Sequence, residues 1–501
     1  MNRSQLRSLF LSVYLLFCGN SAGTFAADAP QWGIDFGNNR ISKETNLPES
    51  FNPGKKNPEG DGITGTSPNV KWIARIGSRT YTPPIVADGK VFLGTNNDAK
   101  FDPSFEGDAG VLLCLDEKTG KFLWQYAAKK ADEKKHFDAA NIGITSTPVV
   151  AGKRVYFIDN RGTVNALDTE TGKPVWQLDL ITTFKVRQHD ANNHQVILHN
   201  GLIYAGTANG LDDKHAEMEQ PEAPSFVVID ADTGKPLARD GNWLTTNIPH
   251  GQWCLPALGL VKGQDGKEHP HLYYGTGNGI VHSFKALDKE ELLKKVPQNI
   301  GEFGNNLPKI EAEWTFDGNG ADIVGAENVK PLKGGRGSAA NICLPPLVFS
   351  DNKLYVLFGT EGITGARPFT AVMTALNPQS GQQRLLWKSE IIEKGALSPQ
   401  CIADGLVYFG DRGGGFYCLD AETGKTVWKL DLKGDHWAGA MLADGKIYLG
   451  TNRRMFYVLR AGRTAAILSE TEMPDAVFAG ASAVNETLFV SCNGFLYAVK
   501  K

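Results

Sequence analysis

The sequence predicts an all-β protein: an eight-bladed β-propeller of four-stranded antiparallel blades. A seven-residue phrase ending in Thr-Gly-Lys recurs at residues 115–121, 167–173, 229–235 and 419–425. A second phrase, Ala-Asp-Gly followed by a short apolar strand, recurs at residues 87–92, 403–408 and 443–448. Both phrases contain turn residues flanked by side chains that alternate with a period of two. This pattern is typical of antiparallel meanders.

One unit shows how the strands follow each other. Apolar residues 148–150 lead into a Gly turn, and residues 155–158 form an alternating strand. A polar turn, a third strand at residues 164–167, the Thr-Gly-Lys turn and a closing strand ending in Trp176 complete the unit. Because four such strands cannot bury both of their faces alone, the units must stack on one another. A ring of stacked sheets is a propeller.

The repeat occurs eight times along the chain. The innermost strands are expected near Thr82, Thr147, Gln195, Leu255, Leu344, Ser398, Gly439 and Gly480. The last unit ends at Lys501 after three strands, whereas residues 70–76 read as an outer strand without a blade. We therefore expect the N-terminal strand to complete the last blade and close the ring, because closure removes two exposed sheet edges.

The first residues have the pattern of a secretory signal. Two arginines precede the apolar residues 9–17, and small residues lead to Ala26. This pattern predicts cleavage after Ala26 and a periplasmic or secreted protein. Lipidation of Cys18 is disfavoured, because Phe17 stands where a lipoprotein signal needs a small residue. No later apolar run approaches the length that spans a bilayer, so no membrane span is expected.

The sequence divides into a signal peptide (1–26), an irregular leader (27–69) and one propeller domain (70–501). The net charge is −3 and no long basic run appears, which excludes nucleic acid as an expected partner. The leader is rich in Gly, Asn and Pro. Removing residues 27–51 is expected to destabilise the fold less than removing residues 70–76, because only the second change opens the ring.

Six tryptophans share one place in the repeat, on the closing strands. They are Trp72, Trp124, Trp176, Trp314, Trp387 and Trp428. Identical placement on outer strands predicts that they dock one blade against the next rather than stack on a cofactor. Arg239 in the third blade and Ile467 in the seventh occupy this place instead, so we expect these two junctions to be weaker or to pack differently.

Binding is expected on one face of the disc. The links between second and third strands and the links between blades share that face, and it carries the insertions at residues 96–109, 208–224 and 360–369 and the connector 317–340. The candidate ligand-binding residues precede inner strands on this face. They are His194, His250, Trp253, Arg336, Asn341, His436 and Trp437. The alternative is that these polar residues only cap exposed strand ends.

Three further features are interpreted as structural. Residues 288–295 are expected to form a short solvated helix that Asp288 caps, with Glu291 three residues on. The acidic residues of the loop 96–109 lack the spacing of a calcium loop, so no metal site is predicted there. Cys254 and Cys343 hold equivalent places in successive blades, and a disulfide between them stays open.

The repeat also resembles a known family. The phrase Asp-x-x-Thr-Gly-Lys-x-x-Trp, at residues 168–176 and 420–428, is similar to the repeat of pyrroloquinoline quinone (PQQ) type β-propellers, and the resemblance covers residues 70–501. That family includes quinoprotein alcohol dehydrogenases and an outer-membrane assembly lipoprotein. The resemblance favours an exported, non-enzymatic scaffold that binds a small molecule or an envelope protein at the loop-rich face. A cell-envelope assembly factor is one alternative.

The second alternative is a dehydrogenase that depends on PQQ and calcium. Members of that kind commonly have neighbouring cysteines over the cofactor and acidic groups for the metal. This chain has no neighbouring cysteine pair, so no cofactor is predicted for the favoured function. If the chain is an enzyme, Asp190 beside His189 is the weak candidate for the base that removes the alcohol proton.

Overall fold

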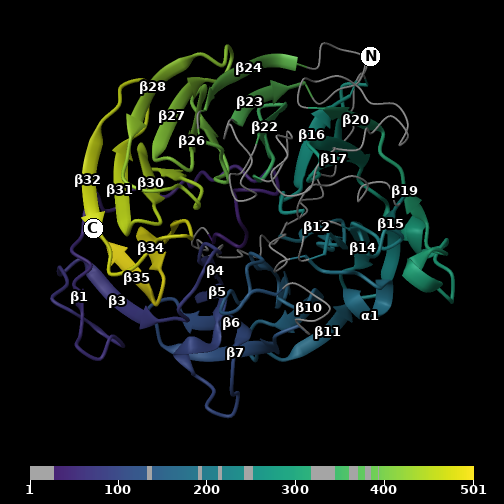
Figure 1. The fold of residues 1–501 in the computed structure, drawn as a ribbon, viewed down its shortest axis with the longest axis horizontal. Coiled ribbons are helices and arrows are strands. Elements are labelled where there is room, and N and C mark those ends of the chain that lie inside the picture. The colour runs from purple at the N-terminus through teal and green to yellow at the C-terminus, as the bar shows by residue number, and fades with distance from the viewer. Residues whose placement is uncertain are drawn as a thin grey trace, which may run out of the picture.

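The described strands form eight sheets in a closed ring (Figure 1), as the repeat predicts. The structure, a computed structural model, describes residues 28–131, 138–189, 195–212, 217–241, 252–263, 265–317, 345–359, 371–377, 385–392 and 394–501. Within each blade the chain meanders outward from the ring axis, so consecutive strands are hydrogen-bonded neighbours.

The first four blades are given from the inner strand outward. Blade 1 consists of β4 (Ile85–Ala87), β5 (Lys90–Asn96), β6 (Ala109–Asp116) and β7 (Phe122–Lys129). Blade 2 consists of β8 (Val149–Ala151), β9 (Arg154–Ile158), β10 (Thr163–Asp168) and β11 (Pro174–Asp179). Blade 3 contains β12 (Ile197–His199), β13 (Leu202–Gly206), β14 (Phe226–Asp230) and β15 (Pro236–Asp240). Blade 4 consists of β16 (Ala257–Lys262), β17 (Glu268–Gly275), β18 (Ile280–Lys285) and β20 (Trp314–Asp317).

The other four blades repeat this order. Blade 5 consists of β21 (Val348–Ser350), β22 (Lys353–Gly359), β23 (Ala371–Leu376) and β24 (Leu385–Ile392). Blade 6 consists of β25 (Cys401–Ala403), β26 (Leu406–Gly410), β27 (Gly415–Asp420) and β28 (Thr426–Asp431). Blade 7 consists of β29 (Met441–Ala443), β30 (Lys446–Gly450), β31 (Met455–Arg460) and β32 (Ile467–Glu472). Blade 8 consists of β33 (Ser482–Val484), β34 (Thr487–Cys492), β35 (Phe495–Lys500) and β3 (Val70–Arg75).

The ring closes through β3, as the orphan strand predicts. β3 pairs antiparallel with β35, and Trp72 lies opposite Ala498. The N-terminal strand therefore supplies the outer strand of the blade whose other three strands end the chain. Figure 1 shows this junction where the purple β3 lies beside the yellow β35.

Blade 3 differs from the four-stranded pattern. A fifth short strand, β19 (Lys309–Ile310), pairs in parallel with β15. β19 belongs to the insertion between β18 and β20, which folds back over blade 3. Arg239, which replaces the usual tryptophan, is fully buried under this insertion and donates to the side chain of Asn305 at 3.1 Å. The blade 3 junction is therefore packed differently, as predicted, because an arginine needs partners that the insertion supplies.

The insertion also carries the predicted short helix, α2 (Lys289–Leu293). Asp288 caps it, because its side chain accepts a hydrogen bond from the Glu291 N–H at 2.9 Å. The remaining small elements are α1 (Leu180–Phe184), the turns η1 (Asn97–Ala99) and η3 (Glu302–Gly304), and a hairpin of β1 (Lys55–Lys56) and β2 (Ile63–Thr64). In the described part of the chain, no helix has the length and apolar character needed to cross a bilayer.

Five of the six repeated tryptophans donate a hydrogen bond to the next blade, whereas Trp314 stacks on His271 of its own blade with ring centroids 5.0 Å apart. Trp124 of blade 1 donates its indole N–H to the Thr169 carbonyl of blade 2 at 3.0 Å, and Trp428 of blade 6 reaches Gly462 of blade 7 at 2.9 Å. A Cβ at Gly172 would lie 2.5 Å from the ring of Trp124. Glycine is therefore needed in the Thr-Gly-Lys turn for two reasons, its positive φ of 66° and the close approach of this ring. Trp72, Trp176 and Trp387 make the same kind of hydrogen bond.

The leader contacts the innermost part of every blade. Its backbone pairs with Val86 in blade 1, and its carbonyls accept the N–H groups of Val150, Leu258, Phe349 and Leu442. Blades 3, 6 and 8 are bonded to the leader through hydrogen bonds that involve side chains, at Gln195, Ile402 and Ala481. The purple segment consequently runs through the centre of the ring in Figure 1. The sequence contains no pattern that predicts this role.

Arg40 lies at the ring axis as part of this segment. Its guanidinium is 3 % exposed and donates to the carbonyls of Gly439 (2.6 Å) and Ala481 (2.5 Å), in blades 7 and 8. It also lies 5.0 Å from the ring of Trp32. Burial lowers the pKa of Arg40 to about 10, so the group remains charged at neutral pH. A Cβ at Gly480 would lie 1.9 Å from Arg40 Nη1, so a larger residue here would require the guanidinium to move away from its carbonyl partners.

Candidate functional site

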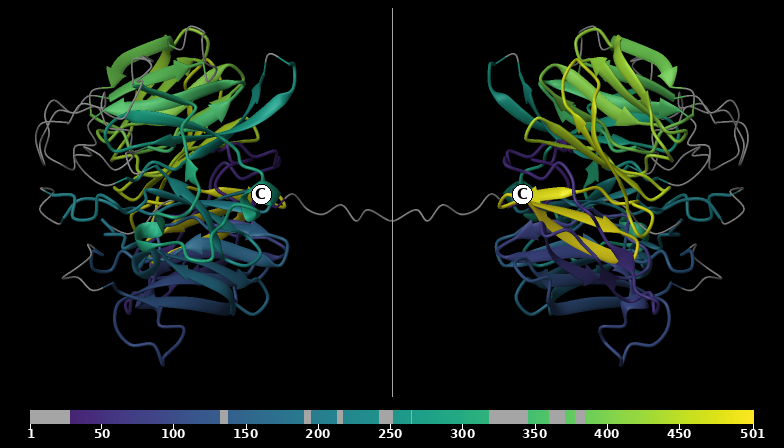
Figure 2. Two further views of the ribbon diagram at one scale, coloured as in Figure 1. Left: turned by 90° about the vertical axis from the view of Figure 1, so that its right-hand side faces the viewer. Right: turned by 90° about the vertical axis from the view of Figure 1, so that its left-hand side faces the viewer.

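The backbone of leader residues 29–47 and the blade connectors lie toward opposite ends of the inner strands, whereas the hairpin of β1 and β2 lies at the connectors, where Lys56 pairs with Asp475 at 2.5 Å. The leader bonds to the ends nearest the first-to-second strand turns, and it reaches those turns directly where the Leu47 N–H donates to the Asp444 carboxylate at 3.0 Å. Figure 2 shows this purple segment toward one flat side of the disc. The connectors that precede the inner strands are therefore at the other, loop-rich side, where the sequence places binding.

One position in these connectors is more open than its neighbours. It lies five residues before the inner-strand residue that bonds to the leader, which in blade 8 is Ala483, whose carbonyl accepts a hydrogen bond from the Ser42 hydroxyl at 3.4 Å. We call the described residues at this position the axial collar: Tyr81, Thr145, Trp253, Leu397, Trp437 and Phe478. All six are half-buried, whereas the residues directly before and after each of them are buried. In the described connectors, the collar residues are therefore accessible to a ligand, unlike their immediate neighbours in the chain.

Three aromatic members of the collar form one cluster. The ring centroids of Tyr81 and Phe478 are 5.4 Å apart, and those of Trp437 and Phe478 are 5.7 Å apart in an edge-to-face arrangement. Tyr81 and Trp437 are 6.5 Å apart although blade 8 separates their blades. Side chains from non-neighbouring blades meet only near the axis. The aromatic cluster (Tyr81, Trp437, Phe478) thus lies over the ring centre.

A charged pair flanks this cluster. The Arg412 guanidinium carbon lies 5.1 Å from the ring centroid of Trp437, and Arg412 Nη2 lies 3.8 Å from the Asp435 carboxylate. Asp411 holds the turn that presents Arg412, because its carboxylate accepts the N–H groups of Gly413 and Gly415 and the Tyr417 hydroxyl. The arginine is therefore fixed as a cation beside an aromatic face.

His436 lies beneath the cluster. It is 1 % exposed and packs against Phe416 and Gly410 of blade 6. Burial lowers the pKa of His436 to about 4, so the ring is neutral at pH 7. The backbone of Gly414 and Gly450 partly offsets this shift, but neither ring nitrogen has a hydrogen bond of normal geometry. His436 therefore packs against blade 6 and does not face solvent.

The predicted site residues have different positions. Trp253 and Trp437 are half-buried members of the collar. His189, the neighbour of the suggested base, is buried, and its Nδ1 lies 2.9 Å from the Leu211 carbonyl oxygen. The other candidates, Asp190, His194, His250, Arg336 and Asn341, lie outside the described residues. Within the described chain, the structure brings Trp437 together with Tyr81 and Phe478.

Tyr81 and Phe478 are not among the residues that the sequence singled out. Both stand seven residues before the Asp or Asn of the first-to-second strand turn, at Asp88 and Asn485, as Trp437 stands before Asp444. Aligning the connectors on this turn would have found them.

Candidate metal ligands and cysteines were also located in the described part of the chain. Within the described residues, His, Cys, Asp and Glu side chains do not gather in groups of three that could hold a metal ion. Cys254 is buried with its Sγ 3.1 Å from the Pro345 carbonyl oxygen, and Cys343 lies outside the described residues. The possible pairing of these two cysteines therefore stays untested.

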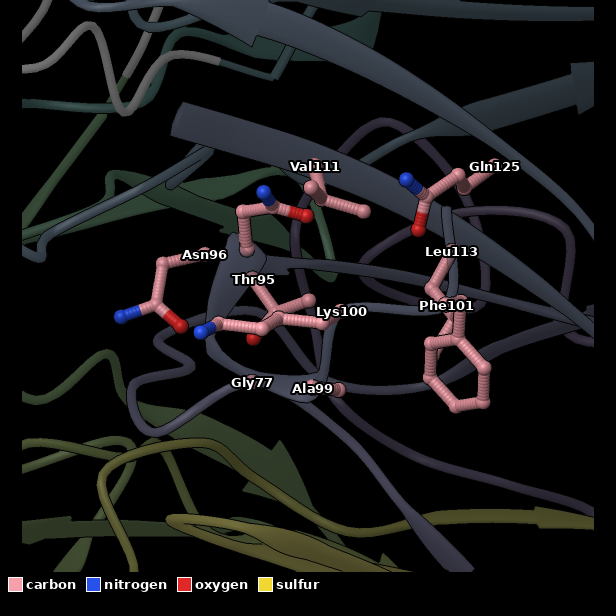
Figure 3. A pocket seen from close by; sticks show the side chains of 10 residues that line it. Gly77, Thr95, Asn96, Ala99, Lys100, Phe101, Val111, Leu113 and Gln125 are labelled. Carbon is pink, nitrogen blue, oxygen red and sulfur yellow. The ribbon is translucent and has the colours of Figure 1, made fainter. Parts of the chain in front are cut away.

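A pocket of about 450 Å³ opens beside the aromatic cluster, between blades 8 and 1. It is lined by Lys56, Gly60, Arg75, Ile76, Ser78, Arg79, Asp98, Asp475, Phe478, Asn493, Gly494 and Phe495. Phe478 belongs both to this pocket and to the cluster. Figure 3 shows a second, smaller crevice under η1, lined by Asn96, Phe101 and Leu113 among others, which is too narrow for a water molecule.

The closed ring of meanders joined by Asp-x-x-Thr-Gly-Lys turns defines the class of PQQ-like β-propellers. Within that class, the family model described as outer membrane protein assembly factor BamB matches residues 63–294 and 370–494. These ranges cover more than half of the chain, and the chain belongs to this family.

Individual relatives are distant. Outer membrane protein assembly factor BamB of Yersinia pestis is 25% identical over 324 residues, which are 60% of this chain and 70% of the relative. Polyvinylalcohol dehydrogenase of Sphingopyxis sp. (strain 113P3) is 23% identical over 409 residues, 72% of this chain and 56% of the relative. The crystal structure of BamB from Moraxella catarrhalis superposes with a TM-score of 0.52 at 13% identity, covering 86% of this chain and 98% of that chain. This last likeness concerns the fold alone.

Proposed function

We propose that this chain is an exported scaffold of the cell envelope that binds a protein partner at the loop-rich end of its ring axis. The family to which the chain belongs supports the envelope and scaffold part of the proposal. The proposed location outside the cytoplasm rests on the signal-like residues 1–26. Intact-mass measurement of the exported protein tests it: the mass should be that of a chain beginning at Ala27, and a retained signal peptide would contradict the proposal.

The aromatic cluster is the observation that carries the binding site. Tyr81, Trp437 and Phe478 are half-buried, lie together and have Arg412 beside them. Trp, Tyr and Arg are the residues that contribute most to protein interfaces when they lie at the centre of a patch. The backbone of leader residues 29–47 lies toward the opposite end of the axis, so the cluster lies at the end that a partner can approach.

Site-specific crosslinking in the producing cells tests this site. A photoreactive phenylalanine analogue at Tyr81 should capture a discrete envelope protein, whereas the same analogue at Lys425, in a Thr-Gly-Lys turn on the other face, should not. Adding Trp437→Ala to the chain that carries the analogue at Tyr81 should remove the adduct while the circular dichroism spectrum stays unchanged. Equal capture from both positions, or capture that survives Trp437→Ala, would reject the placement.

A PQQ-dependent dehydrogenase is the second candidate, favoured by the similarity to polyvinylalcohol dehydrogenase. The described residues supply no group of three side chains suited to calcium, so this candidate has no described ligand set. Purified protein incubated with PQQ and calcium should show a bound chromophore and reduce an artificial electron acceptor with alcohols if it is such an enzyme. Failure to bind PQQ rejects this candidate and leaves the scaffold proposal intact.

A further inference from the structure

The pocket between blades 8 and 1 combines two exposed arginines with aromatic walls. We propose that this pocket binds an acidic peptide segment of a partner protein, with Arg75 and Arg79 holding its carboxylates and Phe478 packing against an adjacent apolar side chain. The inference goes beyond the proposed function, because it concerns an adjoining site that shares Phe478 with the aromatic cluster but has its own ligand chemistry.

The fold places both arginines at the seam of the ring. Arg75 ends β3, the outer strand of blade 8, and Arg79 lies on the connector that continues to β4 in blade 1. The connector is held on the turn between β34 and β35, because the Ile76 N–H donates to the Gly494 carbonyl at 2.8 Å and the Gly494 N–H donates to Gly77 at 3.1 Å. The arginines therefore project from a fixed rim.

The carboxylates of the pocket leave both guanidinium groups available. Asp475 pairs with Lys56 at 2.5 Å, and Asp98 accepts a hydrogen bond from the Ser78 hydroxyl. Arg79 donates only to the Tyr81 hydroxyl at 3.3 Å, and Arg75 only to the Asp98 backbone carbonyl at 3.5 Å. Among the described residues neither arginine forms an ion pair, and both are exposed. A guanidinium without a carboxylate partner is suited to bind one from a ligand, in a two-pronged geometry.

The apolar part of the pocket favours a peptide over a small anion. Phe478 and Phe495 line the pocket, and Phe478 continues into the aromatic cluster through Tyr81. A volume of about 450 Å³ takes a few residues of an extended chain. The whole chain carries a net charge of −3, so the attraction for an acidic segment arises locally from this rim and not from the overall charge.

Peptide binding to the full mature chain tests the inference. The probe is the acetylated and amidated tetrapeptide Phe-Glu-Glu-Phe with a fluorescent label, and Phe-Gln-Gln-Phe is its uncharged match. We expect fluorescence anisotropy to show binding about tenfold or more tighter for the acidic peptide. The double variant Arg75→Gln, Arg79→Gln should lose this preference. Arg161→Gln, an exposed arginine in blade 2, should retain it.

Salt dependence, a variant of the aromatic cluster and competing anions provide further tests of this pocket. Binding of the acidic peptide to the unmodified protein should weaken as salt is added, a measurement that needs no variant. Trp437→Ala should leave peptide binding unchanged, so the failure of this site and of the axial site can be told apart. Equal affinity for both peptides, or full binding by the double variant, overturns the proposal. Displacement by inorganic phosphate at the same concentration as the peptide, or sedimentation with phosphatidylglycerol vesicles that depends on the two arginines, also overturns it.

Discussion

At the residue scale, consecutive side chains of a connector face opposite ways, so one is accessible to a ligand and the next packs against a blade. Trp437 points into the aromatic cluster, whereas the preceding His436 is buried against blade 6. Neighbouring residues of an extended segment face opposite ways, so only one of the two can contact a ligand. The sequence predicts both as ligand-binding because their chemistry is suitable, and it contains no signal for which of them is turned inward.

The buried His436 leads to a pH prediction. Its pKa falls to about 4 in the folded protein from an ordinary value of 6.5, so between these values the unfolded chain binds more protons. The contribution of the neutral ring to stability is complete above pH 6.5 and is lost as the pH falls toward 4, by about 3 kcal/mol. Urea unfolding at several pH values should show that His436→Gln has a flatter profile in this window. Parallel profiles for His436→Gln and the unmodified protein would contradict the assignment.

The repeated tryptophans lead to a stability prediction. Trp428 is 9 % exposed and bonds to Gly462 in the next blade. Trp428→Ala should lower the free energy of unfolding by about 3 to 5 kcal/mol, as expected for truncation of a packed aromatic side chain. Trp437→Ala is the matched control, because it removes the same side chain from a half-exposed site and should cost about 1 kcal/mol. Denaturant unfolding of both variants measures the difference. Equal losses would mean that the closing-strand tryptophans do not carry the blade junctions.

At the element scale, periodic elements were predictable and the leader was not. The turn phrases and the alternation around them located the blades, the capped helix at Asp288 and the strand that closes the ring. The leader bonds mainly through its backbone, as at Ala29 and Phe36, and backbone hydrogen bonds leave no periodic pattern in side chains. The same reason explains why the sequence suggested that removing residues 27–51 would destabilise the fold less than removing residues 70–76.

The leader contacts change the expected effect of truncation. A chain that begins at Asn52 keeps β3 but loses the segment that bonds to the innermost part of all eight blades, so its thermal midpoint should fall clearly below that of a chain that begins at Asp28. Unpaired inner-strand backbone groups and the empty place of Arg40 are the physical reasons. A synthetic peptide of residues 28–51, added to the shortened chain, should raise its midpoint, because a ligand that binds only the folded state stabilises it. Arg463→Ala is the control and should have almost no effect, because its ion pair is exposed. Equal midpoints for the two chains would show that the leader only lies on the ring.

At the scale of the whole molecule, the ring depends on one strand that joins the two ends of the chain. β3 covers the edge of β35, and without it blade 8 would have three strands and an unpaired edge that can associate with other chains. A chain that begins at Gly77 should therefore differ from one that begins at Asn52 by a loss of cooperative unfolding and by the appearance of oligomers in light scattering. A point change in the full chain checks this without truncation. Ala74→Asp places a carboxylate at a site of β3 that is 7 % exposed and should cost several kcal/mol, whereas Lys71→Asp on the exposed side of the same strand should be nearly neutral. A monomeric, cooperatively unfolding Gly77 chain, together with a stable Ala74→Asp variant, would show that the other seven blades hold the ring without this closure.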